Sequence, residues 1–440
     1  MAEAFSDQRR IESETIRKVG IRLVPFLVVC YFIAYVDRVN VGFAALTMNK
    51  DLGLSATAFG TGAALFFVAY VIFEVPSNLA LERFGARRWI ARIMISWGLV
   101  GLGSAFVTGA VTFSIARFLL GAAEAGFFPG VILYLTYWFP KAYRARIVAM
   151  FMVAIPVSSF LGSPLSASLL TLDGVGGLRG WQWLLICESI PALLLGLATL
   201  VVLPSKPAEA QFLTSEQKAW LEGCLEAERR AASAGHSGHG SVWSVLTNKQ
   251  VWLLAVIYSG SSATSNALSL WMPQILKSFG LSNLETGLLN MIPFGIASVF
   301  MIFWGLRADK SGERIWSTAL PLALTSLSLG LTLLTGSLTI TLVLLSLVLL
   351  GNYSIKGPFF ALVTETLSPA QAAAGIAAIN TLAHLGTGAI TSLIGVLREQ
   401  TGSFPVALLP LCALTAVGCA LVFWIGRDRM RASAAVAPAR

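Results

Sequence analysis

The sequence predicts an all-α membrane protein of twelve transmembrane helices, arranged as two six-helix bundles with both termini in the cytoplasm. Hydrophobic residues make up 56% of the 440-residue chain and charged residues only 12%. A soluble protein of this length needs far more charge to cover its surface. Apolar runs of about 20 residues, enough to cross about 30 Å of hydrocarbon, recur along the whole chain. Basic residues gather in alternate loops between these runs.

The apolar runs define the expected spans in chain order. In the first half they lie at 21–46, 57–80, 89–109, 112–137, 147–170 and 182–203. In the second half they lie at 250–275, 285–306, 316–336, 339–364, 374–397 and 403–426. The first twenty residues carry charges of both signs, unlike the short basic start of a cleavable signal peptide. We therefore expect the first span to be retained.

A charged and then Gly/Ser/His-rich stretch separates the two sets of spans. The expected division is a cytoplasmic N-terminal segment 1–20, a bundle 21–203, a cytoplasmic linker 204–249, a bundle 250–426 and a cytoplasmic tail 427–440. His236 and His239 in the linker have no further ligands nearby, so we read them as part of a solvated loop rather than a metal site. The five cysteines are scattered without a CxxC pair, so we expect no disulfide, metal or cofactor.

The positive charges indicate the topology. The chain has a formal net charge of +9 from 31 Lys and Arg against 22 Asp and Glu. With the N-terminus placed in the cytoplasm, 24 of the 31 basic residues fall on that side, four fall outside and three lie within spans. This asymmetry follows the positive-inside rule for an even number of helices. Because topology accounts for the basic charge, we expect no nucleic-acid partner.

One loop sequence occurs in both halves, after the second span of each. NLALERFGARR at 78–88 and GLRADKSGERI at 305–315 align at an offset of 227 residues. The matched residues are an acid, a cation, a glycine and a second cation: Glu82, Arg83, Gly85 and Arg87 with Asp309, Lys310, Gly312 and Arg314. This match predicts an internal duplication. Two basic turns that obey the charge rule would explain the cations, but not the acid and the glycine.

The repeated loop resembles the cytoplasmic loop motif of the major facilitator superfamily, Gly-x-x-x-Asp-Arg/Lys-x-Gly-x-Arg/Lys. The second copy matches closely, whereas the first has Asn78 for the glycine and Glu82 for the aspartate. The resemblance covers the whole chain through its six-plus-six layout. It implies two bundles related by an axis along the membrane normal, a binding site near the midplane between them, and loops that brace the cytoplasmic gate.

Several ionisable residues lie inside the expected spans. They are Asp37, Arg38, Glu74, Arg117, Glu124, Glu188, Lys356 and His384. A charge inside the bilayer costs several kcal/mol, so such residues usually face a water-filled cavity and have partners. Arg117 and Glu124 are seven residues apart, which places them on one helix face about 10 Å apart along the axis. Glu74 and Glu188 lie nearer span ends, where capping or gate contacts explain them better than substrate binding.

Depth places Asp37 and Arg117 at similar levels and Glu124 near the midplane. Carboxylates beside guanidinium groups stay ionised, but they can take up a proton when a competing anion occupies the arginines. Arginine binds a carboxylate well because its planar fork makes two hydrogen bonds. The alternative is a structural salt-bridge network that joins the first and fourth spans, which is weakened because buried ion pairs stabilise poorly compared with apolar packing.

Three segments together resemble the anion:cation symporter branch of the superfamily. They are YVDRVN in the first span, FEVPSNL in the second and RFLLGAAEAGFFPG in the fourth. That branch contains bacterial organic-acid permeases related to tartrate, phthalate, hydroxyphenylacetate and sugar-acid transporters. The resemblance implies a bacterial inner-membrane protein in which Asp37 and Glu124 bind protons and Arg38 and Arg117 clamp the substrate carboxylate.

Other polar side chains are candidates to contact the substrate. In the first half, Tyr35 and Tyr70 could donate hydroxyls or could simply pack. In the second half the candidates are Asn266, Asn352, Tyr353, Lys356 and Asn380. Lys356 would add a third positive charge, unless it extends to the cytoplasmic face or pairs with an acid. His384 would either titrate in the site or act as a polar helix contact.

We therefore expect a proton-coupled symporter that imports a small organic acid anion by alternating access. Its partners would be the anion, the proton and the lipid bilayer, and we expect a monomer without an obligate protein partner. An exporter of lipophilic compounds is less compatible, because the cations in the site would repel cationic substrates. A sensor that binds without transport is a further alternative. An enzyme is not expected, because HExxH and GxSxG are both missing from the sequence. The sequence leaves the identity of the acid open.

Overall fold

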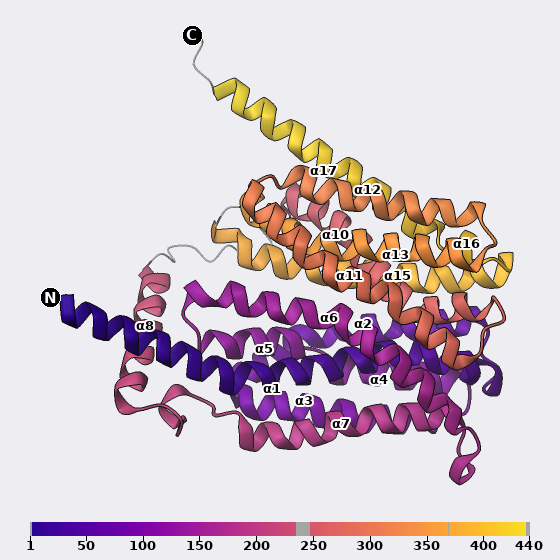
Figure 1. Cartoon of the computed structure of the whole chain (residues 1–440), viewed down its shortest axis with the longest axis horizontal. Helices are drawn as coiled ribbons and strands as arrows, with labels where there is room; N and C mark the ends of the chain where they lie inside the picture. Colours follow the sequence, from indigo (N-terminus) through magenta and orange to yellow (C-terminus); the bar gives the residue numbers. More distant parts are fainter. Residues whose placement is uncertain (1, 235–246, 368, 437–440) are drawn as a thin grey trace.

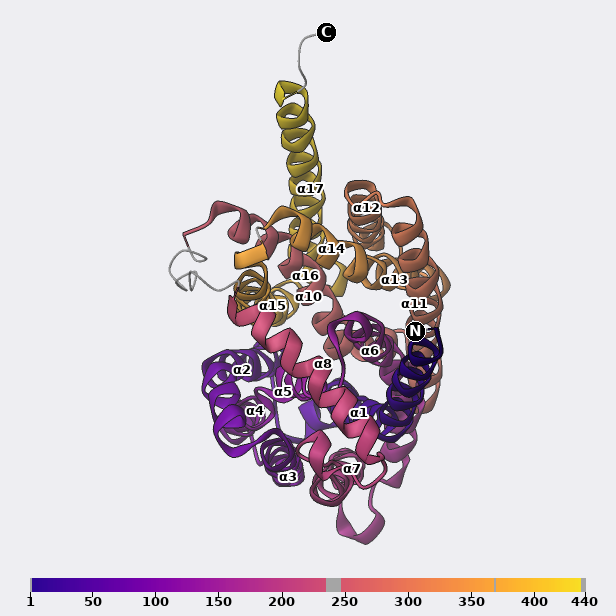
Figure 2. The ribbon, with the colours of Figure 1, turned by 90° about the vertical axis from the view of Figure 1, so that its left-hand side faces the viewer.

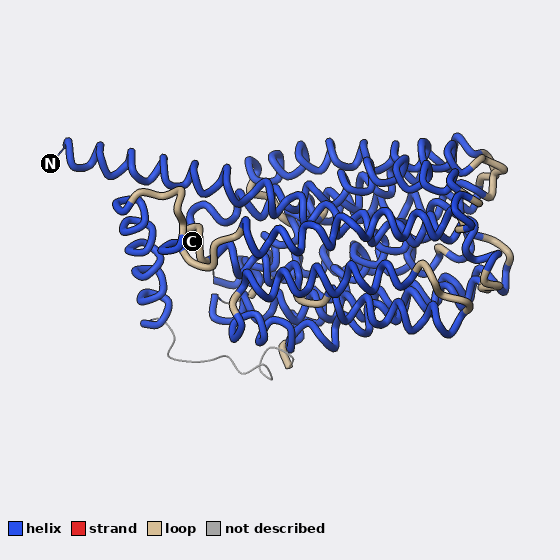
Figure 3. The backbone as a smooth tube through the Cα atoms, turned by 90° about the horizontal axis from the view of Figure 1, so that it is seen from below, coloured by secondary structure: helices blue, strands red, loops and turns tan. Residues whose placement is uncertain are grey.

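The protein is described here from a computed structural model, which describes residues 2–234, 247–367 and 369–436. Within these residues every regular element is a helix, and the backbone contains no strand (Figure 3). The linker histidines His236 and His239 lie outside the described residues. The all-α expectation is thereby confirmed for the described chain.

The first half contains seven long helices. They are α1 (Ala2–Asp51), α2 (Ala56–Phe84), α3 (Ala86–Ser104), α4 (Ala110–Glu124), α5 (Phe127–Thr136), α6 (Lys141–Leu169) and α7 (Gly180–Val202). Short 3₁₀ turns follow α6 at Leu170–Leu172 and Val175–Gly177. Local sequence explains where α2 begins and ends. The Ser55 hydroxyl accepts the Ala58 N–H at its start, and Gly85, with φ of 85°, ends it.

The linker and the second half follow. The linker contains a 3₁₀ turn at Pro207–Glu209 and the helix α8 (Ser215–Ala234). The second half comprises α10 (Lys249–Lys277), α11 (Asn283–Ser311), α12 (Ile315–Leu331), η4 (Thr332–Leu334), α13 (Leu338–Ser354), α14 (Lys356–Thr366), α15 (Pro369–Thr401), α16 (Phe404–Ala407) and α17 (Leu409–Val436).

Each expected span lies on a helix or on a pair of successive helices. Within the described residues, ten stretches are long and apolar enough to cross a membrane. The helices α3 and α10 are not among them. Three arginines stand in the first turns of α3, and α10 contains the polar run SGSSATSN. The count of twelve crossings and the cytoplasmic location of the termini therefore stay predictions.

Two expected spans are interrupted well inside their length. The span at 112–137 is divided between α4 and α5 at Ala125 and Gly126. The span at 339–364 is divided between α13 and α14 at Ile355, whose φ of −67° and ψ of −28° stay helical. Gly126 adopts φ of 84°, and a Cβ atom there would collide with the Ser77 side chain. The two breaks occupy similar places in the two halves, as a duplicated unit would have them.

The two halves lie side by side, with α1 to α7 in one group and α10 to α17 in the other (Figures 1 and 2). The start of α1 and the end of α17 lie at the end of the molecule that carries α8, here called the α8 end; the opposite end is the far end (Figure 1). The halves meet through α2 on α15, α6 on α11 and α1 on α10.

Contacts between the halves concentrate toward the far end. Glycines allow the backbones to approach: a Cβ on Gly42 of α1 would collide with the α10 backbone, and one on Gly287 of α11 would collide with α6. Between α2 and α15, the Thr57 N–H donates to Glu399 Oε2 at 2.8 Å. The structure is therefore closed between the halves at the far end.

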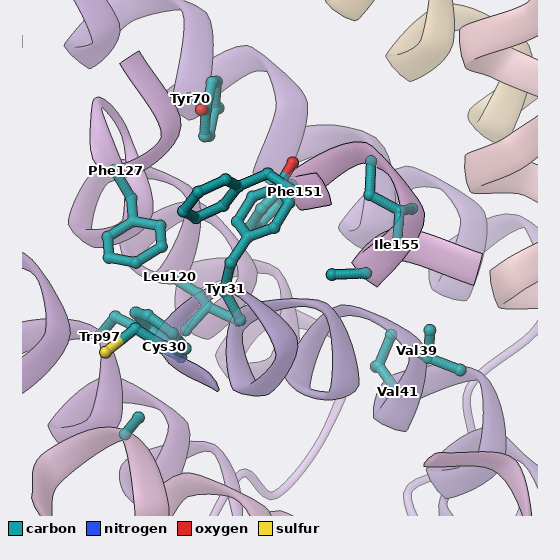
Figure 4. Packing of buried hydrophobic residues seen from close by; sticks show 14 of the residues in the cluster. Cys30, Tyr31, Val39, Val41, Tyr70, Trp97, Leu120, Phe127, Phe151 and Ile155 are labelled. Atoms are coloured by element: carbon teal, nitrogen blue, oxygen red, sulfur yellow. The ribbon is translucent and has the colours of Figure 1, made fainter. Parts of the chain in front are cut away.

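The core of the first half is aromatic. Tyr31 of α1 stacks on Phe128 with ring centres 5.3 Å apart and meets Phe151 of α6 edge-on at 5.7 Å. Trp97 of α3 meets Phe127 of α5 edge-on at 5.7 Å. Figure 4 labels Tyr31, Trp97, Phe127 and Phe151 in this cluster. They fix α1 against α5 and α6, and α3 against α5, and so position the charged residues of α1.

Helix α8 packs against the first half at the α8 end. Lys18 Nζ donates to Gln217 Oε1 at 3.1 Å, which ties α1 to α8. Arg144 of α6 pairs with Glu228 of α8 at 2.9 Å. These contacts join the linker helix to two helices of the first bundle.

Candidate functional site

An ion pair joins α1 to α4 within the first half. Arg38 Nε donates to Glu124 Oε1 at 2.6 Å, and Arg38 Nη2 lies at the same distance from this oxygen. The Glu124 side chain is 2% exposed, whereas that of Arg38 is 18% exposed. The carboxylate is thus enclosed by protein, while part of the guanidinium group remains accessible.

Aromatic rings surround both arginines of the site. The Arg38 guanidinium carbon lies 5.0 Å from the ring centre of Tyr35 and 5.5 Å from that of Tyr70. The Phe66 ring lies 5.7 Å from the Arg38 guanidinium carbon and 4.8 Å from that of Arg117. Phe66 and Tyr70 are one turn apart on α2 and therefore share a face. The ring faces attract both cations and limit their motion.

Arg117 has fewer partners than Arg38. Its side chain is buried, and its Nε atom has no hydrogen-bond partner among the described residues. It lies close enough to Asp37, Glu124 and Arg38 for their charges to interact. A buried guanidinium with an unused N–H is a group that an incoming anion can satisfy.

Asp37 has a different environment from the other three charged residues. Its carboxylate accepts hydrogen bonds from Asn40 Nδ2 at 2.7 Å and from Trp97 Nε1 at 2.8 Å. Successive residues of a helix point about 100° apart. Asp37 therefore faces α3, while Arg38 faces α4 and α2. The structure brings Arg38 and Glu124 into direct contact and gives Asp37 neutral hydrogen-bond partners.

The second half contributes a buried lysine. Lys356 is 8% exposed and stands at the start of α14, directly after the break at Ile355. Its Nζ atom lies 4.4 Å from the ring centre of Tyr353, and it makes no ion pair within the described chain. Its cation is therefore held by a ring face rather than by an acid.

The expected asparagines have mixed surroundings. Asn352 Nδ2 donates to Ser265 Oγ at 2.6 Å, which ties α13 to α10, while its buried Oδ1 has no partner among the described residues. Asn266 Nδ2 donates to the Ser262 carbonyl of its own helix at 2.8 Å. Asn380 is half-buried on α15, one turn before His384. Of the three, Asn352 presents the clearest unused acceptor.

Side chains of the two halves meet beside Arg38. The His384 ring centre lies 5.2 Å from that of Tyr70 and 6.2 Å from that of Phe67. Tyr353 and Tyr258 of the second half lie close enough to Tyr35 for electrostatic interaction. His384 thus packs on aromatic rings of the opposite half, and its Nδ1 atom is buried without a partner among the described residues.

Glu74 and the repeated loops lie toward the α8 end. Glu74 of α2 contacts Thr381 of α15, across the two halves. In the second loop, Arg314 pairs with Asp309 at 3.1 Å and with Glu365 of α14 at 3.2 Å. No ion pair joins Glu82, Arg83 or Arg87 to another side chain in the described part of the first half. The loop network is therefore formed in one half.

The two turn glycines of the repeated loops behave alike. Gly85 and Gly312 have φ of 85° and 66°, and each donates its N–H to a carbonyl four residues earlier. The matched glycine is thus explained by helix termination after the second span of each half.

Sequence reasoning missed several residues that shape the site. Phe66 lies beside both arginines, and Asn40 and Trp97 hold Asp37. Tyr258 of the second half lies close enough to Tyr35 for electrostatic interaction. Helical spacing could have indicated Asn40, which is three residues after Asp37 on the same face. Phe66 gives no such signal, because aromatic residues are common throughout an apolar span.

Comparisons with known proteins place the chain among transporters. The sequence profile of the Major Facilitator Superfamily matches residues 27–391. A protein of Agrobacterium vitis described as "Putative tartrate transporter" is 45% identical over 96% of this chain and 93% of its own. A quinolone resistance transporter of Acinetobacter baumannii is 38% identical over 94% of this chain and 95% of its own. The crystal structure of a D-xylose–proton symporter is 16% identical, covers 92% of this chain and 96% of its own, and superposes with a TM-score of 0.73.

Proposed function

We propose, from the premise that this chain belongs to the major facilitator superfamily and is a multi-pass membrane transporter, that it imports a small organic acid anion together with protons. The contact between Arg38 and Glu124 carries the proposal. It joins an anion-binding group to a protonatable group at a place where the halves meet.

The anion would bind at the arginines. Arg38 is partly accessible, and Arg117 has an unused N–H close by. Two guanidinium groups next to one aromatic ring can orient a carboxylate through paired hydrogen bonds. Lys356 supplies a further cation from the second half, so a substrate with two acidic groups could contact both bundles.

Proton coupling follows from the same contact. While Arg38 binds Glu124, the guanidinium favours the ionised carboxylate. An anion that binds Arg38 removes this stabilisation of the ionised carboxylate and so favours a protonated Glu124. Loading of the anion and of a proton therefore promote one another. Asp37 is the second proposed proton site, held by neutral donors away from the substrate.

Hydroxyl and amide groups would form hydrogen bonds with the remainder of the substrate. Tyr35 and Tyr70 lie beside Arg38, and Tyr353, Asn352, Asn266 and Asn380 come from the second half. The relative described as "Putative tartrate transporter" supports a tartrate-like hydroxy-dicarboxylate as the first substrate to test. Sugar acids and aromatic carboxylates remain within the proposed class.

The transport cycle would rock the two halves about this site. Contacts at the far end correspond to one closed side, and the Arg314 network would brace loops at the α8 end. We place the chain as a monomer in the bacterial inner membrane, with twelve crossings and with the α8 end in the cytoplasm. The positive-inside asymmetry supports this orientation.

Uptake into proteoliposomes tests the proposal. A panel of organic acids is first screened by thermal shift, because a ligand of the native state raises the melting temperature. Labelled acid should then accumulate when the outside is acidified. Uptake of the bound acid that is indifferent to an imposed pH gradient would contradict proton coupling.

The relative described as "Quinolone resistance transporter" favours a second candidate, export of lipophilic compounds. Arg38, Arg117 and Lys356 oppose cationic substrates but not acidic drugs. Expression in a drug-sensitive host distinguishes the two: lowered drug susceptibility without acid uptake would favour export. A sensor, in contrast, would bind an acid without any counterflow.

A further inference from the structure

Glu188 is a buried carboxyl that the proposed substrate site does not use. It lies about two turns inside α7 and is 4% exposed, so it caps no helix end. The Ser166 hydroxyl of α6 donates to its Oε1 atom at 2.6 Å. Its Oε2 atom is buried and has no hydrogen-bond partner among the described residues. Sequence position predicts a cap or a gate contact, and the place of Glu188 inside α7 excludes the cap.

Asn40 lies between Glu188 and Asp37. Its Nδ2 atom donates to Asp37 Oδ1 at 2.7 Å, and its side chain also contacts Glu188. The two carboxyls are close enough for their charges to interact. Asn40 therefore lies between two acids that come from α1 and α7.

Few other groups act on Glu188. From α7 itself, the neighbouring Cys187 thiol interacts with it; from α6 the contact is the Ser166 hydroxyl. From α3, Gly101 lies against Ser189, beside the two acids. None of the described Lys or Arg side chains forms an ion pair with Glu188. The charge of an ionised Glu188 would thus be uncompensated.

Two ionised carboxylates at one buried place repel each other and lose their hydration. Asp37 accepts two N–H donors, which suit an anion. Glu188 has one hydroxyl donor and one bare oxygen, and a protonated carboxyl can use such an oxygen for its own O–H. We propose that Glu188 is a proton-binding site, and that Glu188 and Asp37, with Asn40 between them, hold a transported proton away from the substrate.

This inference rests on the proposed symport function for its role in transport. The proton binds to a carboxylate oxygen of the pair, and its release restores the anion. Because α1 runs toward the far end, Asn40 and Glu188 lie on the far-end side of Asp37. The pair therefore lies between the far end and the Arg38–Glu124 contact.

Infrared spectroscopy of the purified full chain tests proton binding without transport. A protonated carboxyl has its own C=O stretching band, which an amide lacks. Glu188→Gln should remove a carboxyl band that titrates in the wild type, and Ser166→Ala should shift the same band. Glu216→Gln, at an exposed position of α8, is the matched control. A titrating band that is unchanged in both Glu188→Gln and Ser166→Ala would overturn the proposal.

Proteoliposomes test the role of the pair in coupling. Glu188→Gln should lose accumulation driven by a pH gradient, and Asn40→Ala should shift the pH at which accumulation is half-maximal. Wild-type accumulation with an unchanged pH midpoint in both variants would remove the coupling role. If the wild type itself shows no pH-driven uptake, the symport function fails, and the infrared result still decides proton binding at Glu188.

Discussion

At the scale of single residues, the two arginines of the candidate site have different partners. Arg38 is paired with Glu124, while Arg117 lies over Phe66 with an unused N–H. Buried ion pairs add little stability compared with apolar packing. Folding stability therefore does not explain these charges, whereas the proposed binding of an anion would.

Replacing either arginine should remove anion binding. Arg38→Ala or Arg117→Ala deletes charge-assisted hydrogen bonds of about 1.5–3 kcal/mol each, so affinity should fall by about a hundredfold or more. Arg230→Ala on exposed α8 is the matched control and should bind as the wild type. Thermal-shift titration with a bound acid measures the effect. Normal affinity in either site variant would rule out the proposed clamp.

Replacing Glu124 should separate exchange from accumulation. Glu124→Gln keeps the shape of the side chain but cannot cycle a proton. Counterflow of labelled acid should persist, while accumulation driven by a pH gradient should be lost. Both are measured in the same proteoliposomes. Normal accumulation in this variant would mean that Glu124 is not a coupling site.

The residues of the candidate site could be predicted from the sequence, but the side chains that they contact could not. Helical spacing and depth brought Arg38, Arg117 and Glu124 into one neighbourhood. Depth also predicts Asp37 at the level of Arg117, whereas the turn of the helix directs its carboxylate to Asn40 and Trp97. Direction around a helix depends on packing between helices, which a single sequence does not reveal.

At the scale of helices, the two interrupted spans are the main difference from the sequence prediction. Hydropathy is averaged over a window of residues, so it does not reveal the helix interruptions at Gly126 and Ile355. The chain requires glycine at position 126 because φ is 84° and Ser77 lies where a Cβ atom would be. The breaks leave Glu124 next to the end of α4 and Lys356 at the start of α14.

The break between α4 and α5 is expected to require glycine at position 126. Gly126→Ala should destabilise the protein by about 1 kcal/mol or more, because alanine is strained at positive φ and would press on Ser77. Gly103→Ala, in an exposed helical position with open space around it, should be neutral or slightly stabilising. Melting temperatures of the purified variants measure both. Equal stability of the two variants would argue against a structural need for this break.

At the scale of the whole molecule, the halves are joined at the far end. The duplicated loop and the charge asymmetry predicted the two-bundle organisation, because both patterns extend over the full chain. The closed end could not be predicted from the sequence. It depends on close helix approach at glycines such as Gly42 and Gly287, and the sequence does not show which helix lies opposite them.

A cross-link should hold the far end closed. The hydroxyls of Thr61 on α2 and Ser392 on α15 lie 3.3 Å apart. Thr61→Cys with Ser392→Cys, in a variant whose five native cysteines are replaced, should form a disulfide under oxidation and stop transport. Reduction should restore it, and Thr61→Cys alone should be insensitive. Full transport by the oxidised double variant would show that the far end need not open.

The attachment of α8 has a practical consequence for observing this transporter at work. Lys18 and Arg144 fasten the linker helix to α1 and α6, so the helix should travel with the first bundle as one body. A fluorophore on its exposed face, at Glu216 for example, and a second dye on the second bundle would together report the tilt of the first bundle relative to the second. Single-molecule recordings could then count turnovers without any label near the cargo.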